Sequence, residues 1–438
     1  MDPVTIGYLC IILLLSMLAL GVPVGMALAA SGLIGMFWGV GEMFAFGQLR
    51  TLPYSVVSNY AYAVLPLFVF MGVVAEATGI TGQVFRAADV FLRSIRGGLY
   101  MVVTVGSAVF AAVSGSTTVN SVVFTRLAFP QMLKFDYSRS LSIGCIAAAG
   151  SFAAMIPPSI TMVIYAIMTE QSIGRLLLAG LVPGAMSVVA YIIAIMVMVR
   201  VRPSLAPAIN EVRASWREKL GSLRWLGGIV ALLGIVLGGI YFGIFPPSAA
   251  GAVGATGAMA IGLAVMRGRV RSWLGKALFD AAAISCVLFV ILIGGLLFSR
   301  MLVVLGVINE VVEVITLIAD TPLAFLLFVA VIYIVLGCFL DTTSMMVVTL
   351  PFLYPISQEL GVDPIWFGII IVKLIEISVI TPPVGLNLFA VMSAVDRDTH
   401  FQHVVKGVLP FFLIEIVLLG FLIAFPVIAT GLPSLMMR

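Results

Sequence analysis

Residues 150–160 read Gly-Ser-Phe-Ala-Ala-Met-Ile-Pro-Pro-Ser-Ile, and residues 381–387 read Thr-Pro-Pro-Val-Gly-Leu-Asn. Each proline pair lies inside a long apolar segment, from about residue 139 to 168 and from about 364 to 394. Proline lacks an amide donor and clashes with the preceding turn, so each segment is predicted to break into two half-helices. The carbonyls freed at such a break are potential ligands for a buried cation.

The composition is that of a membrane protein. Of the 438 residues, 62% are hydrophobic and 10% are charged, whereas a soluble domain has about 25% charged residues. A helix needs about 20 apolar residues to cross a ~30 Å hydrocarbon core, so this length allows about ten spans. Soluble enzymes, nucleic-acid binders and disordered scaffolds are excluded.

Ten apolar runs are long enough to be spans, five on each side of a basic linker at residues 200–225. They cover residues 4–20, 22–40, 61–78, 139–168 and 176–199, then 226–245, 248–266, 279–298, 364–394 and 404–427. Two more apolar stretches, at about 98–134 and 321–359, are each interrupted by a polar cluster. Their arms of about 16 residues are too short to cross the membrane twice, so both are predicted to be re-entrant hairpins.

The two halves repeat at a constant offset. Thr117 and Thr118 correspond to Thr342 and Thr343 at 225 residues, and the proline pairs share that offset. Residues 1–199 and 226–438 are therefore predicted to be two copies of one unit. Because five spans separate equivalent points, the second copy enters the membrane inverted. The predicted fold is an all-α polytopic membrane protein, an inverted repeat with five spans and one re-entrant hairpin per half.

The distribution of cations predicts the topology. With the N-terminus outside, only Arg50, Arg175, Arg300 and Arg438 fall on the outer side, and Lys373 lies within the membrane. The other 18 of the 23 lysines and arginines, including those of the linker, then lie in cytoplasmic loops. This bias satisfies the positive-inside rule.

Two sodium sites are predicted where the polar clusters meet the helix breaks, because sodium is a hard cation that prefers oxygen ligands. The alternative for any single hydroxyl is a bond to its own helix. The first candidate set comprises Ser114, Ser116, Thr117, Gly150, Ser151 and Ile156. The second comprises Asp341, Thr342, Thr343, Ser378, Thr381 and Asn387.

A small organic anion is the predicted substrate. Half-helix N-termini present amide donors and positive potential, which favours a carboxylate or a similar group between the two cations. The candidate substrate residues are Ser116, Thr117, Thr118, Thr342 and Thr343. Lys373 and Glu376, three residues apart within a span, are interpreted first as a pair that neutralises itself.

No enzyme chemistry is indicated. His400 and His403 are the only histidines and lie in a predicted cytoplasmic loop, so no HExxH zinc site is available at membrane depth. The cysteines are isolated in apolar runs, and no GxxxxGK[ST] nucleotide loop occurs. Neither a nucleotide, a haem nor a transition metal is expected as cofactor.

The two proline motifs, together with Gly180-Leu181-Val182-Pro183-Gly184, resemble the large, DctM-type subunit of tripartite ATP-independent periplasmic (TRAP) transporters over essentially the whole chain. The resemblance implies sodium-coupled uptake by an elevator motion in the cytoplasmic membrane of a bacterium or archaeon. It also implies a small four-helix membrane partner and a periplasmic substrate-binding protein. The partner is expected to be a separate polypeptide, because the large-subunit pattern starts at the beginning of this chain.

Two alternatives stay open at this point. A self-sufficient sodium–dicarboxylate symporter has a comparable inverted repeat with hairpins. A membrane assembly subunit without transport activity is the second alternative.

Overall fold

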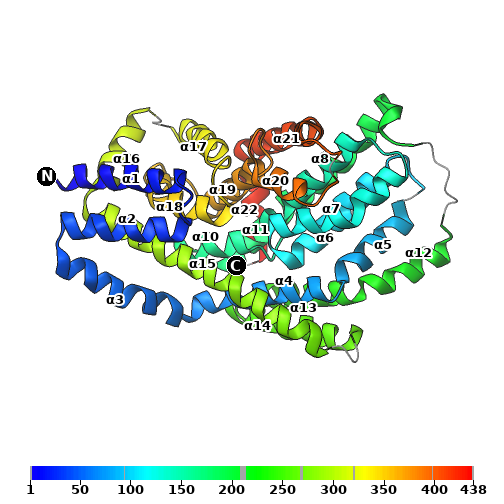
Figure 1. Cartoon of the computed structure of the whole chain (residues 1–438), viewed down its shortest axis with the longest axis horizontal. Helices are drawn as coiled ribbons and strands as arrows, with labels where there is room; N and C mark the ends of the chain where they lie inside the picture. Colours follow the sequence, from blue (N-terminus) through cyan, green and yellow to red (C-terminus); the bar gives the residue numbers. More distant parts are fainter. Residues whose placement is uncertain are drawn as a thin grey trace.

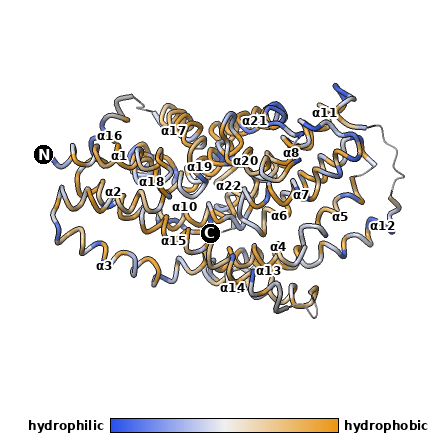
Figure 2. The backbone as a smooth tube through the Cα atoms, in the orientation of Figure 1, coloured by the Kyte–Doolittle hydropathy of each residue, from blue (hydrophilic) through white to orange (hydrophobic). Residues whose placement is uncertain are grey.

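The computed structural model describes residues 2–92, 94–207, 214–266, 270–318, 321–396 and 398–436. The middle of the linker, residues 208–213, and Arg438 lie outside these ranges. All regular secondary structure in the described residues is helical. Hydrophobic residues dominate nearly every helix along its length (Figure 2).

The described residues up to 201 contain eleven α-helices. They are α1 (Pro3–Ala19), α2 (Val24–Gly39), α3 (Glu42–Ser58), α4 (Val64–Ala77), α5 (Ile80–Leu92), α6 (Gly98–Ser114), α7 (Thr117–Lys134), α8 (Arg139–Gly150), α9 (Phe152–Met155), α10 (Ile160–Met168) and α11 (Ile173–Val201).

After the linker the helices follow a similar order. They are α12 (Trp216–Leu223), α13 (Gly227–Tyr241), α14 (Pro247–Val265), α15 (Val270–Val304), α16 (Val307–Ile318), α17 (Pro322–Leu336), α18 (Thr342–Glu359), α19 (Pro364–Ser378), α20 (Leu386–Met392), α21 (Phe401–Ala424) and α22 (Val427–Met436).

Seven helical stretches of the described residues are long and apolar enough to cross a membrane. They lie at seven of the ten runs chosen from the sequence. The first two runs form the shorter apolar helices α1 and α2. The run at 364–394 is divided by its proline pair into α19 and α20.

The helices α3, α12 and α22 were not expected from the sequence, and α12 lies within the predicted linker. The helix α3 contains Glu42, Gln48, Arg50 and Pro53, so its residues do not form an apolar run. It is nonetheless helical, and it buries Ala45, Leu52 and Val56 on the side that contacts α2 and α15. The short helix α22 follows a break at residues 425–426, where the run at 404–427 was expected to end.

Close helix packing builds the frame around the helix breaks. The most extensive contacts join α2 to α15 and α8 to α21. Between α8 and α21 the backbones approach so closely that a methyl group on Gly144 would lie 2.0 Å from the carbonyl carbon of Gly407. The broken helices α8–α10 and α19–α20 thus lie in the middle of the molecule, with α1–α3 at one end and α5 and α12 at the other (Figure 1).

Candidate ion and substrate site

Both proline pairs interrupt their helices. In the first segment α9 ends at Met155 and α10 begins at Ile160, where the Ser159 hydroxyl caps the new helix by accepting from the amide of Met162 at 3.3 Å. In the second, α19 ends at Ser378 and α20 begins at Leu386. The first segment thus consists of α8, α9 and α10, with its proline pair between α9 and α10, and the second consists of α19 and α20.

The first polar cluster is a tight turn between α6 and α7. Gly115 adopts the left-handed conformation at φ 59°, which a residue with a side chain rarely accepts. Ser116 then caps α7, its hydroxyl accepting from the amide of Val119 at 3.4 Å. The turn packs against the first break, because Gly115 lies beside Ile160 at the start of α10.

A buried hydrogen-bond network joins this hairpin to α8. The Ser107 hydroxyl lies 3.0 Å from Asn120 Oδ1 and 3.0 Å from the carbonyl oxygen of Ala149. The Asn120 amide donates to the carbonyl oxygens of Ser107 at 3.2 Å and of Gly150 at 3.5 Å. Ser107 and Asn120 are fully buried, and neither was among the candidates from the sequence.

Two hydroxyls of the hairpin lack any partner. Within the described residues, Ser114 Oγ and Ser121 Oγ are buried and form no hydrogen bond. Ser121 faces α8 so closely that a methyl group on Gly150 would lie 1.8 Å from its hydroxyl oxygen. A buried hydroxyl without a partner costs about 1–3 kcal/mol, which a bound cation could recover.

The amide of Asn387 also faces α8. Its nitrogen donates to the carbonyl oxygen of Ala147 at 3.4 Å, and its Oδ1 has no partner in the described part of the chain. Ala147 and Gly150 are three residues apart on α8 and thus on one face. The structure therefore brings Asn387, predicted for the second set, to the same helix face as the first set.

At the second hairpin a carboxylate replaces the serine cap. Asp341 Oδ2 accepts from the amides of Thr343 at 3.0 Å and Ser344 at 3.4 Å, and Oδ1 contacts the Ser344 hydroxyl. Asp341 is the N-cap residue of α18, and its side chain is partly exposed.

Three of the predicted hydroxyls bond to their own helices, as the alternative allowed. Ser151 donates to Ala148 at 2.7 Å, Ser378 to Ile375 at 2.8 Å, and Thr381 to Ile377 at 2.8 Å. By contrast, no protein acceptor takes the hydroxyls of Thr117, Thr118, Thr342 and Thr343 in the described residues. The free threonine hydroxyls are available to a ligand.

A buried charge cluster lies next to the helix breaks. Lys373 Nζ lies 2.8 Å from Glu376 Oε2 and is also in direct contact with Glu415 Oε2 from α21. It donates to the Ser187 hydroxyl at 2.8 Å. The sequence indicated the first pair only, since Glu415 is a single acid within the apolar run of α21.

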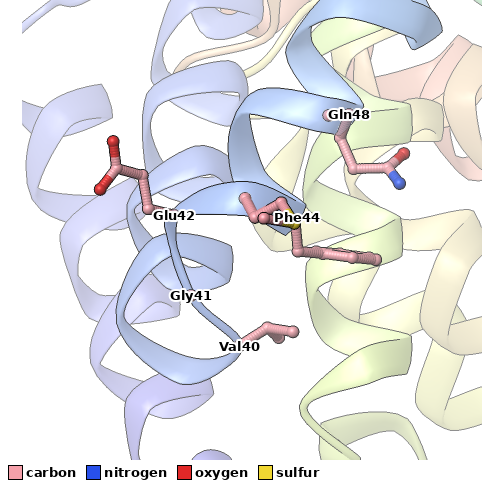
Figure 3. A pocket seen from close by; sticks show the side chains of 7 residues that line it. Val40, Gly41, Glu42, Phe44 and Gln48 are labelled. Atoms are coloured by element: carbon pink, nitrogen blue, oxygen red, sulfur yellow. The ribbon is translucent and has the colours of Figure 1, made fainter.

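A hollow at the start of α3 is a different feature. Residues 40–44, Gly47 and Gln48 line it. Figure 3 shows Glu42 directed away from Phe44 and Gln48, so its polar groups do not converge. It lies at the end of the molecule opposite α5 and α12 (Figure 1) and not at the central breaks.

Comparison with known proteins places these features in a family. The family model of the DctM component of tripartite ATP-independent periplasmic transporters matches residues 11–428. The C4-dicarboxylate TRAP transporter large permease protein DctM of Pseudomonas aeruginosa is 32% identical over 90% of this chain and 91% of its own length. The ectoine large permease protein TeaC of Halomonas elongata is 30% identical over 97% and 98%.

A fused relative and a solved structure extend the comparison. The isethionate permease protein DctMQ of Oleidesulfovibrio alaskensis is 28% identical over 99% of this chain, which covers 66% of that protein. The crystal structure of the YdaH transporter of Alcanivorax borkumensis matches with a TM-score of 0.64 at 16% identity, over 89% of this chain and 90% of that one. At this identity the match shows a shared fold.

Proposed function

Because the chain belongs to the DctM component family of tripartite ATP-independent periplasmic transporters, we propose that it imports a small organic anion driven by sodium. Family membership makes it a multi-pass transporter permease of the bacterial inner membrane and not an enzyme. A TRAP system implies a small membrane subunit and a periplasmic binding protein, and in DctMQ the two membrane components share one chain. The coupling ion, the sites and the motion are the parts proposed here.

The unpartnered buried oxygens carry the proposal. Ser114 Oγ, Ser121 Oγ and Asn387 Oδ1 come from three helices, and all are without a partner in the described residues. Ser121 and Asn387 approach one face of α8 beside the first break. Buried oxygen atoms without a hydrogen-bond partner are suitable ligands for a hard monovalent cation, and those of Ser121 and Asn387 approach the same face of α8.

A second sodium is proposed at the tip of the other hairpin. There the Asp341 carboxylate supplies negative charge, and the hydroxyls of Thr342 and Thr343 are free. The carbonyls released between Ser378 and Leu386 complete the oxygen set, in the manner of unwound transporter helices. The hydroxyls of Ser378 and Thr381 are left out of this set, since their own helices use them.

The substrate anion is proposed to bind between the two tips. Thr117 and Thr118 offer free hydroxyls at the N-terminus of α7, where the helix dipole favours negative charge. C4-dicarboxylates and ectoine are the cargo named for two relatives, and a carboxylate is common to both. At ~100 mV each net charge moved inward contributes about 2.3 kcal/mol, so two sodium ions with a monoanion give an inward bias.

The matching architecture is an inverted repeat that moves as an elevator. The order helix, hairpin and broken helix occurs once in residues 1–199 and again in residues 226–438, with 200–225 as the linker. In this proposal the hairpins and broken helices slide as one body against α2, α4, α14 and α15.

Uptake in liposomes tests the sodium sites. The chain, its small partner and its binding protein are reconstituted, and the half-saturating sodium concentration is measured for Ser121→Ala and Thr342→Ala. Loss of one cation ligand costs about 1–3 kcal/mol, so a five- to hundredfold increase is expected. Thr256→Ala is the matched control, since that hydroxyl only bonds its own helix on α14.

Two results would contradict the proposal. Sodium dependence that is unchanged in both variants removes the hairpins from the cation sites. Sodium-driven uptake by the chain alone, without partners, favours a self-sufficient symporter.

A further inference from the structure

A buried charge cluster next to the helix breaks contains two carboxyl groups but only one ammonium group. Lys373, Glu376 and Glu415 are fully buried, and the side chains of the two ion pairs are 0% exposed. One ammonium group thus faces two acids. If both acids were ionised, the cluster would bury a net negative charge, which costs several kcal/mol in a medium of low dielectric constant.

The lysine has no donor left for further compensation. An ammonium group has three N–H donors. Two are donated, to Glu376 Oε2 and to the Ser187 hydroxyl, and Glu415 Oε2 is in direct contact with the same nitrogen, so no room remains for a fourth partner.

Among the described residues, no second cation contacts the two acids of the cluster. From α11 comes Tyr191, from α8 comes Cys145, and Ser151 lies at the start of α9, so the facing groups are neutral hydroxyls and a thiol. The remaining buried tyrosines nearby bond elsewhere, Tyr165 on α10 to Pro364 and Tyr333 on α17 to Thr349. Neither α18 nor the described part of α22 adds a lysine, arginine or histidine.

The two acids differ in their surroundings. Glu376 lies on the same helix as Lys373 at 2.8 Å and beside the Ser151 hydroxyl. Glu415 contacts the lysine from α21. Within the described residues, Oε1 of Glu376 and both carboxyl oxygens of Glu415 form no hydrogen bond. The Tyr191 hydroxyl is also fully buried, unpartnered and adjacent to Glu415.

We propose that Glu376 and Glu415 share one bound proton, so that the ammonium group of Lys373 faces one carboxylate and one neutral carboxylic acid. Glu415 Oε2 is in contact with Lys373 Nζ, and the unpartnered Tyr191 hydroxyl lies next to Glu415. The cluster is then neutral without a further ligand. A sodium ion would need several oxygen ligands more than the free atoms of Glu415, Glu376 and Tyr191. This proton is distinct from the two sodium ions of the proposed function and does not depend on them.

Infrared spectroscopy of the purified full-length chain with its membrane partner tests the proposal. At neutral pH the wild-type protein is expected to show the carbonyl stretch of one buried protonated carboxylic acid, with a shift in D₂O. Glu415→Gln keeps the neutral shape and is expected to remove that band with little change in the thermal midpoint. Glu359→Gln is the control, because this acid at the end of α18 is exposed and lies outside the buried cluster, so its loss is expected to leave the band unchanged.

A second variant keeps the proposal testable if the first fails to fold. Lys373→Gln leaves two acids without a cation, and the band is expected to double, whereas Lys373→Gln combined with Glu415→Gln returns it to one. Absence of the band in the wild type, or its persistence in Glu415→Gln, overturns the proposal. So does a sodium-dependent increase in thermal midpoint that the wild type shows and Glu415→Gln lacks, since that result identifies a metal cation.

Discussion

At the first hairpin tip the helix α7 begins at Ser116, a neutral cap that accepts one amide at 3.4 Å. At the second tip α18 begins at Asp341, an anionic cap whose Oδ2 accepts two amides at 3.0 and 3.4 Å. The positions are 225 residues apart, and both are followed by two threonines. The two tips therefore share a sequence pattern but differ in charge. A helix N-terminus with a neutral cap favours an anion, whereas one with a carboxylate cap favours a cation.

The buried residues of the two halves also differ in charge. Lys373 and Glu376 on α19 lie 225 residues after Ala148, on α8, and Ser151, which directly follows α8. The first half uses amides and hydroxyls at this depth, and the second uses charges. The difference suggests that substrate binding belongs more to the first tip and charge compensation of sodium more to the second.

Copying the second cap onto the first gives the largest expected effect. Ser116→Asp places a carboxylate at the tip that is proposed to receive the substrate anion. Two like charges at about 4 Å repel by about 4 kcal/mol at an effective dielectric constant of about 20, which is more than a hundredfold in affinity.

Uptake kinetics with the labelled substrate of the binding protein measure this loss. Ser116→Asn is the control, because it caps a helix equally well without charge. Equal half-saturating substrate concentrations in the two variants would show that the anion does not approach the first tip.

Neutralising the second cap is expected to have an intermediate effect. Asp341→Asn retains an acceptor for the amides of α18 but removes the negative charge next to the proposed sodium. Hydrogen bonds and contacts to charged groups contribute about 1.5–3 kcal/mol, so the half-saturating sodium concentration should rise about ten- to hundredfold. Uptake at varied sodium concentration checks this, and a change in substrate affinity without a change in sodium dependence would reverse the assignment of the two tips.

The sequence predicted features that depend on local interactions better than features that depend on contacts between distant residues. The breaks at Pro157 and Pro382 follow from local chemistry, because proline acts on its own helix whatever the tertiary structure. The hairpin tips were predicted in the same way, since polar clusters inside apolar runs are visible in the sequence. The helix α3 was missed because polar residues obscured its apolar contacts.

Partners distant in the chain could not be predicted. Asn387 donates to Ala147, 240 residues earlier, and Glu415 contacts Lys373 from another helix. Ser107 and Asn120 were missed because a single buried polar residue in an apolar run gives no sign of its partner. The sequence did contain one indication of the charge cluster, because Glu415 is a single acid within an apolar span. Acidic residues are rare at such positions and usually have a function.

The smallest expected effect concerns the contact that joins the two halves at the surface. Arg139, the first residue of α8, lies 2.7 Å from Asp396 in the loop after α20 and donates to Thr399 at 2.6 Å. The hydrogen bond from Thr399, together with the nearby Arg139, lowers the pKa of Asp396 below its ordinary value of 3.8. The stabilisation from this carboxylate is therefore present above pH 3.8 and is lost only as the pH falls through the lowered folded pKa.

Asp396 is ionised in nearly all molecules between pH 5 and 8. We therefore expect its contribution to the free energy of unfolding of the wild type to be the same throughout this pH range. Asp396→Asn should reduce the free energy of unfolding by less than about 1 kcal/mol, because the side chain is 43% exposed and exposed ion pairs are weak. Thermal midpoints in detergent at two pH values and two salt concentrations measure the effect, with Asp398→Asn as the neighbouring control. A loss of several kcal/mol would mean that this contact, and not the close packing of α8 on α21, holds the two broken helices together.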